Sequence, residues 1–264
     1  MNEPNQNTYA SAGIVGYYTQ LKQLQPAEKV ILERLKPQLS SMRMLDIGIG
    51  GGRTTTHFAP LAKEYVGIDY SAEMIAACRE RLSKAIPSLS PEALEVMDAR
   101  SMEQFPDHSF DFILFSFNGI DYVSEGDRLK IFEEVKRVGK PGGYFAFSSH
   151  NLQGLQASLT LKKSFSLNPL RTYTNLVMLG LFKLLNPTVN AHQLATADHL
   201  IVRDESHNFR LQTYYIRPKA QLKQLEPFFK NIEVYSWSSG LNLRQWSDSS
   251  QPSDMWLYYL CAIR

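Results

Sequence analysis

Two kinds of hydrophobic pattern alternate along the chain. Short apolar runs predict buried strands, and apolar residues that recur every three or four positions predict helices with one apolar face. The predicted strands are residues 42–47, 64–69, 93–96, 110–115, 144–148, 232–237 and 255–263. Helices are predicted between most of them, with starts near Ser71, Ser124 and Pro218. Strands that alternate with helices in this way predict an α/β fold.

A long insertion, residues 151–213, interrupts this alternation after the fifth strand. An apolar helix is predicted at Thr172–Leu185, where Asn186-Pro187 ends it. Two alternating segments, His199–Arg203 and Asn208–Tyr215, predict a β-hairpin. An insertion of this length with elements of its own is typical of a lid or a binding element.

Composition narrows the class of protein. The chain has 264 residues, of which 44% are apolar and 20% charged, and this fits one large α/β domain with an elaboration. Its net charge of +2 gives no sign of a nucleic-acid-binding protein. Cys78 and Cys261 form neither a metal-binding pattern nor a disulfide framework, so we expect a cytoplasmic protein without a bound metal.

No membrane-targeting segment is predicted. The N-terminus is polar, which does not fit a signal peptide. The most apolar run, Leu176–Leu185, is too short to span a bilayer and contains Lys183.

A glycine-rich turn follows the first predicted strand, with glycines at positions 48, 50, 51 and 52. Glycine accepts a positive φ angle and lets a ligand approach the main chain closely. A helix is predicted to open near Arg53, and a helix N-terminus offers unpaired N–H groups and a partial positive charge. We therefore expect a nucleotide-like ligand at the carboxyl end of this strand, where open α/β sheets bind their ligands.

Two cofactors fit such a turn. A dinucleotide site prefers Gly-x-Gly-x-x-Gly, but Arg53 occupies the third glycine position here, and the acidic Asp46 stands where an apolar residue is usual. The pattern Asp46-x-Gly48-x-Gly50-x-Gly52 resembles motif I of the class I S-adenosylmethionine-dependent methyltransferases. In that family the acidic residue faces the methionine amino group, and the glycines let the carboxylate and the ribose lie against the backbone. The motif alone also allows a turn without a ligand.

The resemblance implies further cofactor contacts. Asp69, at the end of the second strand beside Tyr70, can accept two hydrogen bonds from a ribose diol, although this spacing also fits a nicotinamide cofactor. In the family, the acidic residue at the position of Asp98 bonds the adenine amine, and the N–H of Ala99 reaches a ring nitrogen. Asp98 could equally be a turn or cap residue. Met74 is expected to pack in the core and to touch the adenine.

The remaining candidates come from the N-terminus and from the fourth and fifth strands. N-terminal helices cover the cofactor in the family, which implies contacts from Tyr17 and Tyr18; packing against the sheet edge is the alternative. The segment Ser116–Gly119 resembles motif IV of small-molecule methyltransferases and implies a contact from Ser116. It lacks the Asn/Asp-Pro-Pro-Tyr signature, which argues against DNA or glutamine as acceptor. His150 is the candidate for contact with the acceptor and for a general base, and a histidine satisfied by a backbone carbonyl is the alternative.

The resemblance covers residues 40–150 and, in outline, residues 217–264. It implies a Rossmann-like α/β fold: a seven-stranded, mostly parallel sheet with an antiparallel last strand and helices on both faces. The expected organisation has four parts. These are N-terminal cap helices at 1–39, a cofactor-binding core at 40–150, an inserted lid or acceptor subdomain at 151–216, and the completion of the core at 217–264.

These features predict an enzyme that transfers a methyl group from S-adenosylmethionine to a small molecule. Residues 151–220 carry eight lysines and arginines against three acids, so we expect an anionic, partly hydrophobic acceptor. Attraction to an anionic lipid surface and a merely solvated face are the alternatives. A non-catalytic S-adenosylmethionine-binding module and an NAD-dependent oxidoreductase are the alternative functions. The sequence leaves open the acceptor, the atom methylated, the use of a base and the oligomeric state.

Overall fold

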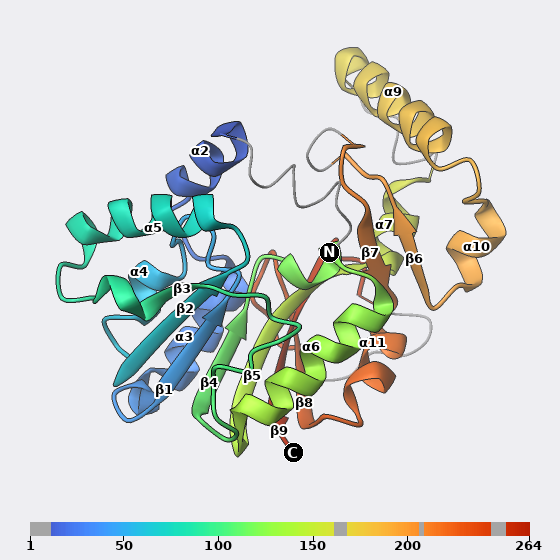
Figure 1. Cartoon of the computed structure of the whole chain (residues 1–264). Helices are drawn as coiled ribbons and strands as arrows, with labels where there is room; N and C mark the ends of the chain where they lie inside the picture. The colour runs from blue at the N-terminus through green and yellow to red at the C-terminus, as the bar shows by residue number, and fades with distance from the viewer. Residues whose placement is uncertain (1–11, 161–167, 206–208, 244–251) are drawn as a thin grey trace.

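A mostly parallel sheet forms the centre of the molecule. The computed structural model describes residues 12–160, 168–205, 209–243 and 252–264, and Figure 1 shows how their elements are arranged. Five strands run parallel in the order β3-β2-β1-β4-β5. Their bounds are Arg43–Ile47 for β1, Glu64–Asp69 for β2, Leu94–Val96 for β3, Phe110–Phe115 for β4 and Gly139–Asn151 for β5.

Two C-terminal strands complete the core. β9 (Trp256–Ile263) lies antiparallel beside β5, and β8 (Phe229–Ser236) pairs antiparallel with β9. The predicted Rossmann-like core of seven strands, with an antiparallel last strand, is therefore confirmed.

The inserted hairpin adds two more strands to this sheet, which the sequence did not predict. β6 (His199–Val202) and β7 (Thr213–Ile216) pair antiparallel, as expected, and β7 pairs parallel with the end of β5. β5 is longer than expected, and its His150 faces Tyr215 on one side and Trp256 on the other. β9 pairs with one side of β5 as far as His150. β4 pairs with the other side only as far as Phe147, so β7 can pair with β5 on that side beyond this point. The insertion thus continues the sheet at its ligand-binding edge.

Helices cover both faces of the sheet. On one face, buried residues of α6 (Glu125–Val138) and α11 (Pro218–Leu225) pack against Ile113 and Phe115 of β4. On the other, α3 (Pro26–Leu39) and α5 (Ala72–Ala85) pack near Phe112 and Leu114. The continuous apolar run of β4 follows from this, since successive side chains enter opposite layers and both layers are buried.

The remaining core helices are short. They are α2 (Ala12–Gln20), α4 (Thr55–Phe58), and the 3-10 helices η1 (Pro91–Ala93) and η2 (Gly119–Tyr122). The helix predicted to open near Arg53 is therefore only one turn long and begins at Thr55, because residues 51–54 remain in the glycine turn. Main-chain groups of the turn, not a long helix, border the ligand-binding edge.

The insertion has a small hydrophobic centre of its own, formed by residues such as Leu155, Phe182 and Val202. Its helices are α7 (Leu152–Ser158), α9 (Pro169–Leu185) and α10 (Ala191–Thr196). The side chain of Asn168 caps α9 by accepting hydrogen bonds from two main-chain N–H groups, which starts the helix three residues before the predicted position. Among the described residues, no helix is long and apolar enough to cross a membrane.

Candidate functional site

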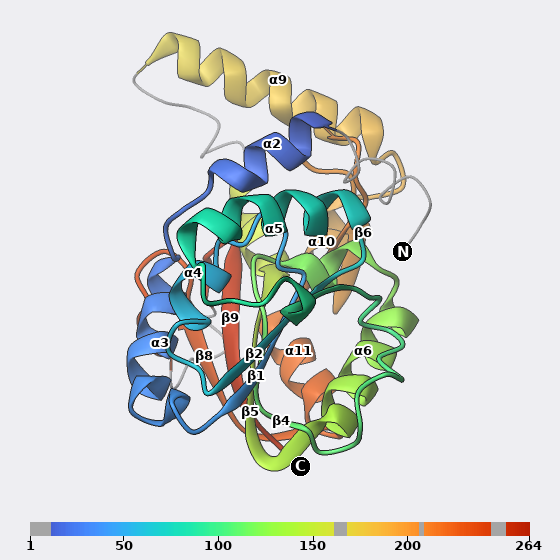
Figure 2. The same ribbon diagram turned by 60° about the vertical axis from the view of Figure 1, so that its left-hand side comes forward.

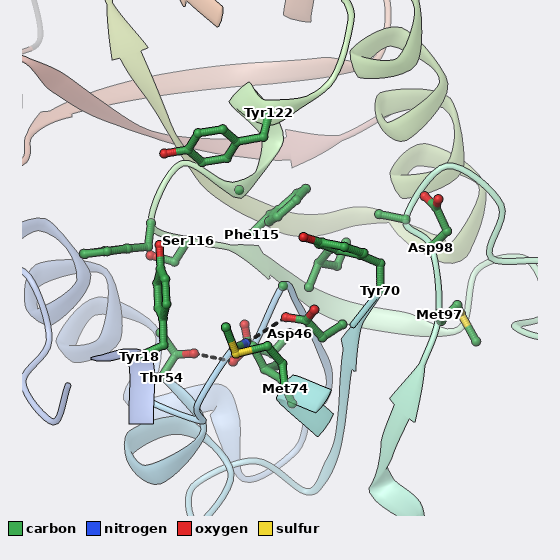
Figure 3. Close-up of a pocket in the computed structure, with 18 of the residues that line it drawn as sticks. Tyr18, Asp46, Thr54, Tyr70, Met74, Met97, Asp98, Phe115, Ser116 and Tyr122 are labelled. Atoms are coloured by element: carbon green, nitrogen blue, oxygen red, sulfur yellow. Dashed lines mark hydrogen bonds between the residues drawn. The ribbon is translucent and has the colours of Figure 1, made fainter. Parts of the chain in front are cut away.

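A cavity of about 350 Å³ opens at the carboxyl ends of β1, β2 and β4. Its walls come from the glycine turn, α2, the start of α5, the segment after β3 and the loop that follows β4. Figure 3 shows Tyr18 and Tyr70 on opposite sides of the cavity, with Tyr122 above them. Aromatic rings and main-chain groups therefore enclose a site of the size that small ligands occupy.

Close packing explains two of the glycines in the turn. A Cβ on Gly51 would lie 2.6 Å from backbone atoms of Thr19, because the end of α2 crosses the turn at this point. Gly52 has a φ of +78°, and a Cβ there would lie 2.8 Å from Sγ of Cys78 on α5. Gly51 borders the cavity and Gly52 does not, so Gly52 serves the contact with α5.

Asp46 is a buried carboxyl group at the floor of the cavity. Thr54 and Tyr65 both donate hydrogen bonds to its Oδ2, at 2.6 and 2.8 Å. Among the residues that the structure describes, none donates a hydrogen bond to Oδ1. Burial raises the pKa of Asp46 to about 7, because desolvation outweighs both hydrogen bonds.

Asp69 braces the glycine turn from the end of β2. Its Oδ2 accepts a hydrogen bond from the main-chain N–H of Gly50 at 2.9 Å, and its Oδ1 accepts one from Ser71 at 3.0 Å. Burial raises the pKa of Asp69, although these N–H groups favour the carboxylate. Each oxygen keeps a second lone pair, so the carboxylate can also accept hydrogen bonds from a ligand in the cavity.

A buried ion pair joins the N-terminal helix to the glycine turn. Arg53 donates to both carboxylate oxygens of Glu28, at 2.5 and 2.7 Å, and the two residues are only 6% and 1% exposed. Glu28 also accepts hydrogen bonds from the hydroxyls of Ser116 and Tyr258. Burial acts to raise the pKa of Glu28, but Arg53 and Ser116 together outweigh it and hold that pKa below its usual value. The guanidinium lies 4.7 Å from the ring centre of Phe117, which lines the cavity.

The segment after β3 lies at the far side of the cavity from Tyr18 (Figure 3). Asp98 and Ala99 both line it, and Arg100 holds the Asp98 carboxylate with its guanidinium and its main-chain N–H. Met74 lines the cavity from the first turn of α5 and is buried. One wall therefore combines a fixed carboxylate with apolar surface.

The loop after β4 has an unusual backbone. Phe117 and Asn118 both have positive φ angles, 60° and 61°, although neither is glycine. The main-chain N–H of Asn118 donates to Oγ of Ser148 on β5, which helps to hold this conformation. Two successive residues in this region cost free energy, and such strain is concentrated at functional sites.

His150 lies one layer behind this loop, outside the cavity lining. Its Nδ1 is 2.7 Å from Oδ2 of Asp121, so Nδ1 carries a proton and donates a hydrogen bond to the carboxylate. Asp121 also pairs with the buried Arg128. On the other side of the ring, Nε2 makes only a long contact of 3.4 Å with Nδ2 of Asn118. The ring of His150 lies 6.3 Å from that of Tyr122, which does line the cavity.

The structure brings most of the predicted site residues together. The following line the cavity: Tyr18, Asp46, Gly48, Gly50, Asp69, Tyr70, Met74, Asp98, Ala99 and Ser116. Three predicted residues lie outside the lining. Gly52 packs against α5, Tyr17 is 57% exposed, and His150 is buried beside Asp121. Within the described ranges, no group of three or more His, Cys, Asp or Glu side chains is placed to hold a metal ion.

Sequence reasoning missed the partners of the site residues. Glu28 carries no motif in the sequence, and Arg53 stands out there as the residue in the third glycine position and at the predicted start of a helix, not as the partner of a carboxylate. Thr54 and Tyr65, which hold Asp46, carried no motif, and neither did Asp121. Each of these partners meets its site residue only in the folded chain, so no spacing rule in the sequence could reveal the contact.

Comparison with known proteins is consistent with this geometry. Residues 45–147 match the model of a family described as a methyltransferase domain. A probable methyltransferase, ltbC, of Aspergillus luteorubrus is 34% identical over 109 residues, which are 39% of this chain and 38% of that protein. A phosphatidylethanolamine N-methyltransferase of Cereibacter sphaeroides is 35% identical over 112 residues, which are 41% of this chain and 50% of that protein. The matches thus span half or less of these two relatives.

Solved structures match over nearly the whole chain. An S-adenosylmethionine-dependent methyltransferase from Mesorhizobium loti has a TM-score of 0.56 and 17% identity, and covers 90% of this chain and 98% of its own. The N-methyltransferase NodS from Bradyrhizobium japonicum, in complex with S-adenosyl-L-homocysteine, has a TM-score of 0.54 and 14% identity, with 97% and 98% covered. At these identities the similarity establishes the fold.

We predict that Glu28→Gln destabilises the protein by about 3–5 kcal/mol, because it leaves the buried Arg53 guanidinium without its charged partner. Urea unfolding at pH 7 measures the effect. Glu33→Gln is a matched control on the same helix, since Glu33 pairs with Lys36 at the exposed surface and its loss should change stability little. Equal effects of the two substitutions would contradict a structural role for the buried pair.

We also predict a pH-dependent difference between the wild-type protein and Asp46→Asn. The folded pKa of Asp46, about 7, lies above its ordinary value of 3.8, so this group stabilises the fold at low pH and loses that effect as pH rises from about 4 to about 7. The stability of the cofactor-free wild type should therefore fall relative to the variant by up to about 1.4 kcal/mol per pH unit. Urea unfolding between pH 4.5 and 7 measures the free energy of unfolding of both proteins. If the two free energies change in parallel with pH, Asp46 is already ionised in the folded protein at pH 4.5, which contradicts the prediction.

Proposed function

We propose that this chain, whose residues 45–147 match a methyltransferase-domain family, is a class I S-adenosylmethionine-dependent methyltransferase that transfers the methyl group of that cofactor to a small molecule. One observation carries the proposal. Asp46, Asp69 and Asp98, from the ends of three successive parallel strands, border a single cavity together with the glycine turn. A ligand with an ammonium group, a ribose diol and an adenine amine presents donors for three such carboxylates.

The cofactor contacts follow from these positions. Asp46 receives the methionine amino group through Oδ1, because Thr54 and Tyr65 already occupy Oδ2. Asp69 accepts from the ribose hydroxyls with the lone pairs that Gly50 and Ser71 leave. Asp98 would accept a hydrogen bond from the adenine amine, the N–H of Ala99 would donate one to a ring nitrogen, and Met74 would offer apolar surface to the adenine. Tyr18 and Tyr70 close the cavity from two sides, and Ser116 stays bonded to Glu28 at its edge.

The chain's own residues contribute mainly alignment and exclusion of water. S-adenosylmethionine, when bound, supplies an electrophilic methyl group on a sulfonium. The strained loop after β4 brings the ring of Phe117 to the cavity, and Tyr122 covers the same side. Aromatic walls there fix the direction of approach of an acceptor and keep water out, which favours in-line attack. The acceptor atom gains the methyl group and gives up a proton where it carried one.

His150 is proposed to take that proton. Asp121 fixes the proton on Nδ1, which leaves the lone pair of Nε2 to act as the base. Oδ1 of Asn118 is buried and has no hydrogen-bond partner among the described residues. A primary amine of the acceptor that reached between Tyr122 and Asn118 would donate one hydrogen bond to Nε2 of His150 and one to Oδ1 of Asn118, whereas a hydroxyl would donate to only one of them.

The insertion, residues 151–216, is proposed to form the lid of the acceptor site. β7 extends the sheet at the edge where the acceptor must enter, and lysines and arginines outnumber acids in this segment. An anionic, partly hydrophobic acceptor suits these properties. Relatives include a phosphatidylethanolamine N-methyltransferase and a ubiquinone biosynthesis O-methyltransferase, so the names of the relatives favour neither nitrogen nor oxygen as the methylated atom.

Binding and product analysis test the proposal. Calorimetric titration should show that S-adenosylhomocysteine binds and that NAD does not. Asp69→Asn should weaken this binding at least tenfold, because a charge-assisted hydrogen bond contributes about 1.5–3 kcal/mol. Incubation with methyl-labelled S-adenosylmethionine and a small-molecule extract should yield a labelled product. Cofactor binding without any labelled product in extracts of the native host would instead indicate a non-catalytic module.

We predict that His150→Ala lowers turnover by about 10²–10⁴-fold, the typical contribution of a general base, and leaves the affinity for S-adenosylhomocysteine nearly unchanged. His192→Ala is the control, because His192 is exposed on α10. Turnover measured at several pH values separates a catalytic from a structural role, because the loss of a general base also removes the pH dependence of turnover that its protonation causes. Full turnover in the His150 variant would assign this histidine to the structural network of Asp121.

A further inference from the structure

The exposed side of α9 is apolar. Seven of its large apolar residues are exposed: Leu170, Tyr173, Leu176, Val177, Leu181, Leu184 and Leu185. Five of these recur at helical spacing, so they form one continuous line along the helix, which we call the α9 stripe. The α9 stripe consists of Leu170, Tyr173, Val177, Leu181 and Leu184.

The opposite side of the helix faces the protein, and Met178 and Leu179 on that side are partly buried. Phe182 is the one fully buried residue of α9, and Asn175 lies on the same side by helical spacing. A surface helix normally presents a polar side to the solvent, whereas the solvent-facing side of α9 is apolar. Leu184 is 73% exposed and Leu170 is 72% exposed, so the two ends of the stripe are as open as its middle. Exposed apolar surface of this extent marks an interaction site.

The two charged residues of α9 itself are both positive. No residue from 135 to 197 is Asp or Glu, whereas Arg171 and Lys183 stand near the two ends of α9. Both side chains are exposed. Lysine and arginine beside an apolar helical face, with an aromatic residue such as Tyr173 among them, are typical of helices that lie in a membrane interface.

The position of α9 suits such a contact. The insertion begins where β5 ends, at the same edge of the sheet as the cavity. Figures 1 and 2 differ by a turn about the vertical axis, and in both of them α9 is the uppermost element, beyond α2 and α5. A flat surface that approached this end of the molecule would therefore meet α9 before the rest of the fold.

We propose that α9 is an interfacial helix that docks this end of the protein on an anionic lipid bilayer. The α9 stripe enters the boundary between headgroups and acyl chains, and Arg171 and Lys183 contact the anionic headgroups. Pairing of the stripe with a second copy of the chain is less favourable. An antiparallel pair of α9 helices would bring Arg171 of one copy close to Lys183 of the other, with no carboxylate on either helix to offset the repulsion.

Vesicle binding tests the inference and needs no acceptor, so its outcome is independent of methyl transfer. The full chain is sedimented with vesicles of phosphatidylcholine alone and of phosphatidylcholine with phosphatidylglycerol in a ratio of about 3:1. We expect binding to the anionic vesicles that weakens as salt rises, because the contribution of surface charge is screened. Equal binding to both vesicles at all salt concentrations would overturn the role of the charges.

A double substitution in the stripe tests the helix itself. Val177→Glu with Leu181→Glu should weaken vesicle binding at least tenfold, whereas Gln38→Glu with Ser83→Glu, at exposed positions on α3 and α5, changes the net charge equally and should have a small effect. Circular dichroism and binding of S-adenosylhomocysteine check that both variants fold. Undiminished vesicle binding by the stripe variant overturns the proposal. A wild-type protein that ignores vesicles but forms a dimer dissolved by these substitutions overturns it in favour of a second copy.

Discussion

The buried pair of Glu28 and Arg53 links the elements on which the cavity depends. Arg53 belongs to the glycine turn, and Glu28 belongs to the first turn of α3. Through the hydroxyls of Ser116 and Tyr258, the same carboxylate also reaches the ends of β4 and β9. Two charges removed from water must be satisfied completely, so four segments are held in one arrangement. The glycine turn can therefore be open to a ligand on one side without losing its shape.

The periodicity of the sequence predicted the core strands well because both layers of the sheet are buried. β2 was predicted with its observed bounds. β4 was predicted from its continuous apolar run, which includes Phe112–Phe115 and which a strand needs when both of its faces are buried. The strand ends then located Asp46, Asp69 and Asp98, since parallel strands bring their carboxyl ends to one edge. These parts of the site follow from local pattern combined with one topological rule.

Contacts between distant segments were not predictable in this way. The pairing of β7 with β5 depends on the length of β5 and on the point at which β4 ends, and hydrophobic alternation reports neither. The environment of His150 depends on Asp121, a residue in a short 3-10 helix with no recognisable motif. From the sequence, a histidine at a strand end is a candidate for contact with the acceptor, whereas the fold places a carboxylate, an amide and three aromatic rings around it.

The raised pKa of Asp46 affects how the cavity binds a cation. Near neutral pH the carboxyl is partly protonated, so the site avoids an uncompensated buried charge until a ligand brings an ammonium group to it. In the proposed complex, binding expels the proton into solvent, and affinity is expected to rise with pH until no proton remains to be displaced. Methylated and demethylated cofactor carry the same amino group and release the same proton. Asp46 thus couples occupancy to pH but does not distinguish substrate from product, a distinction that is left to the groups around the sulfur.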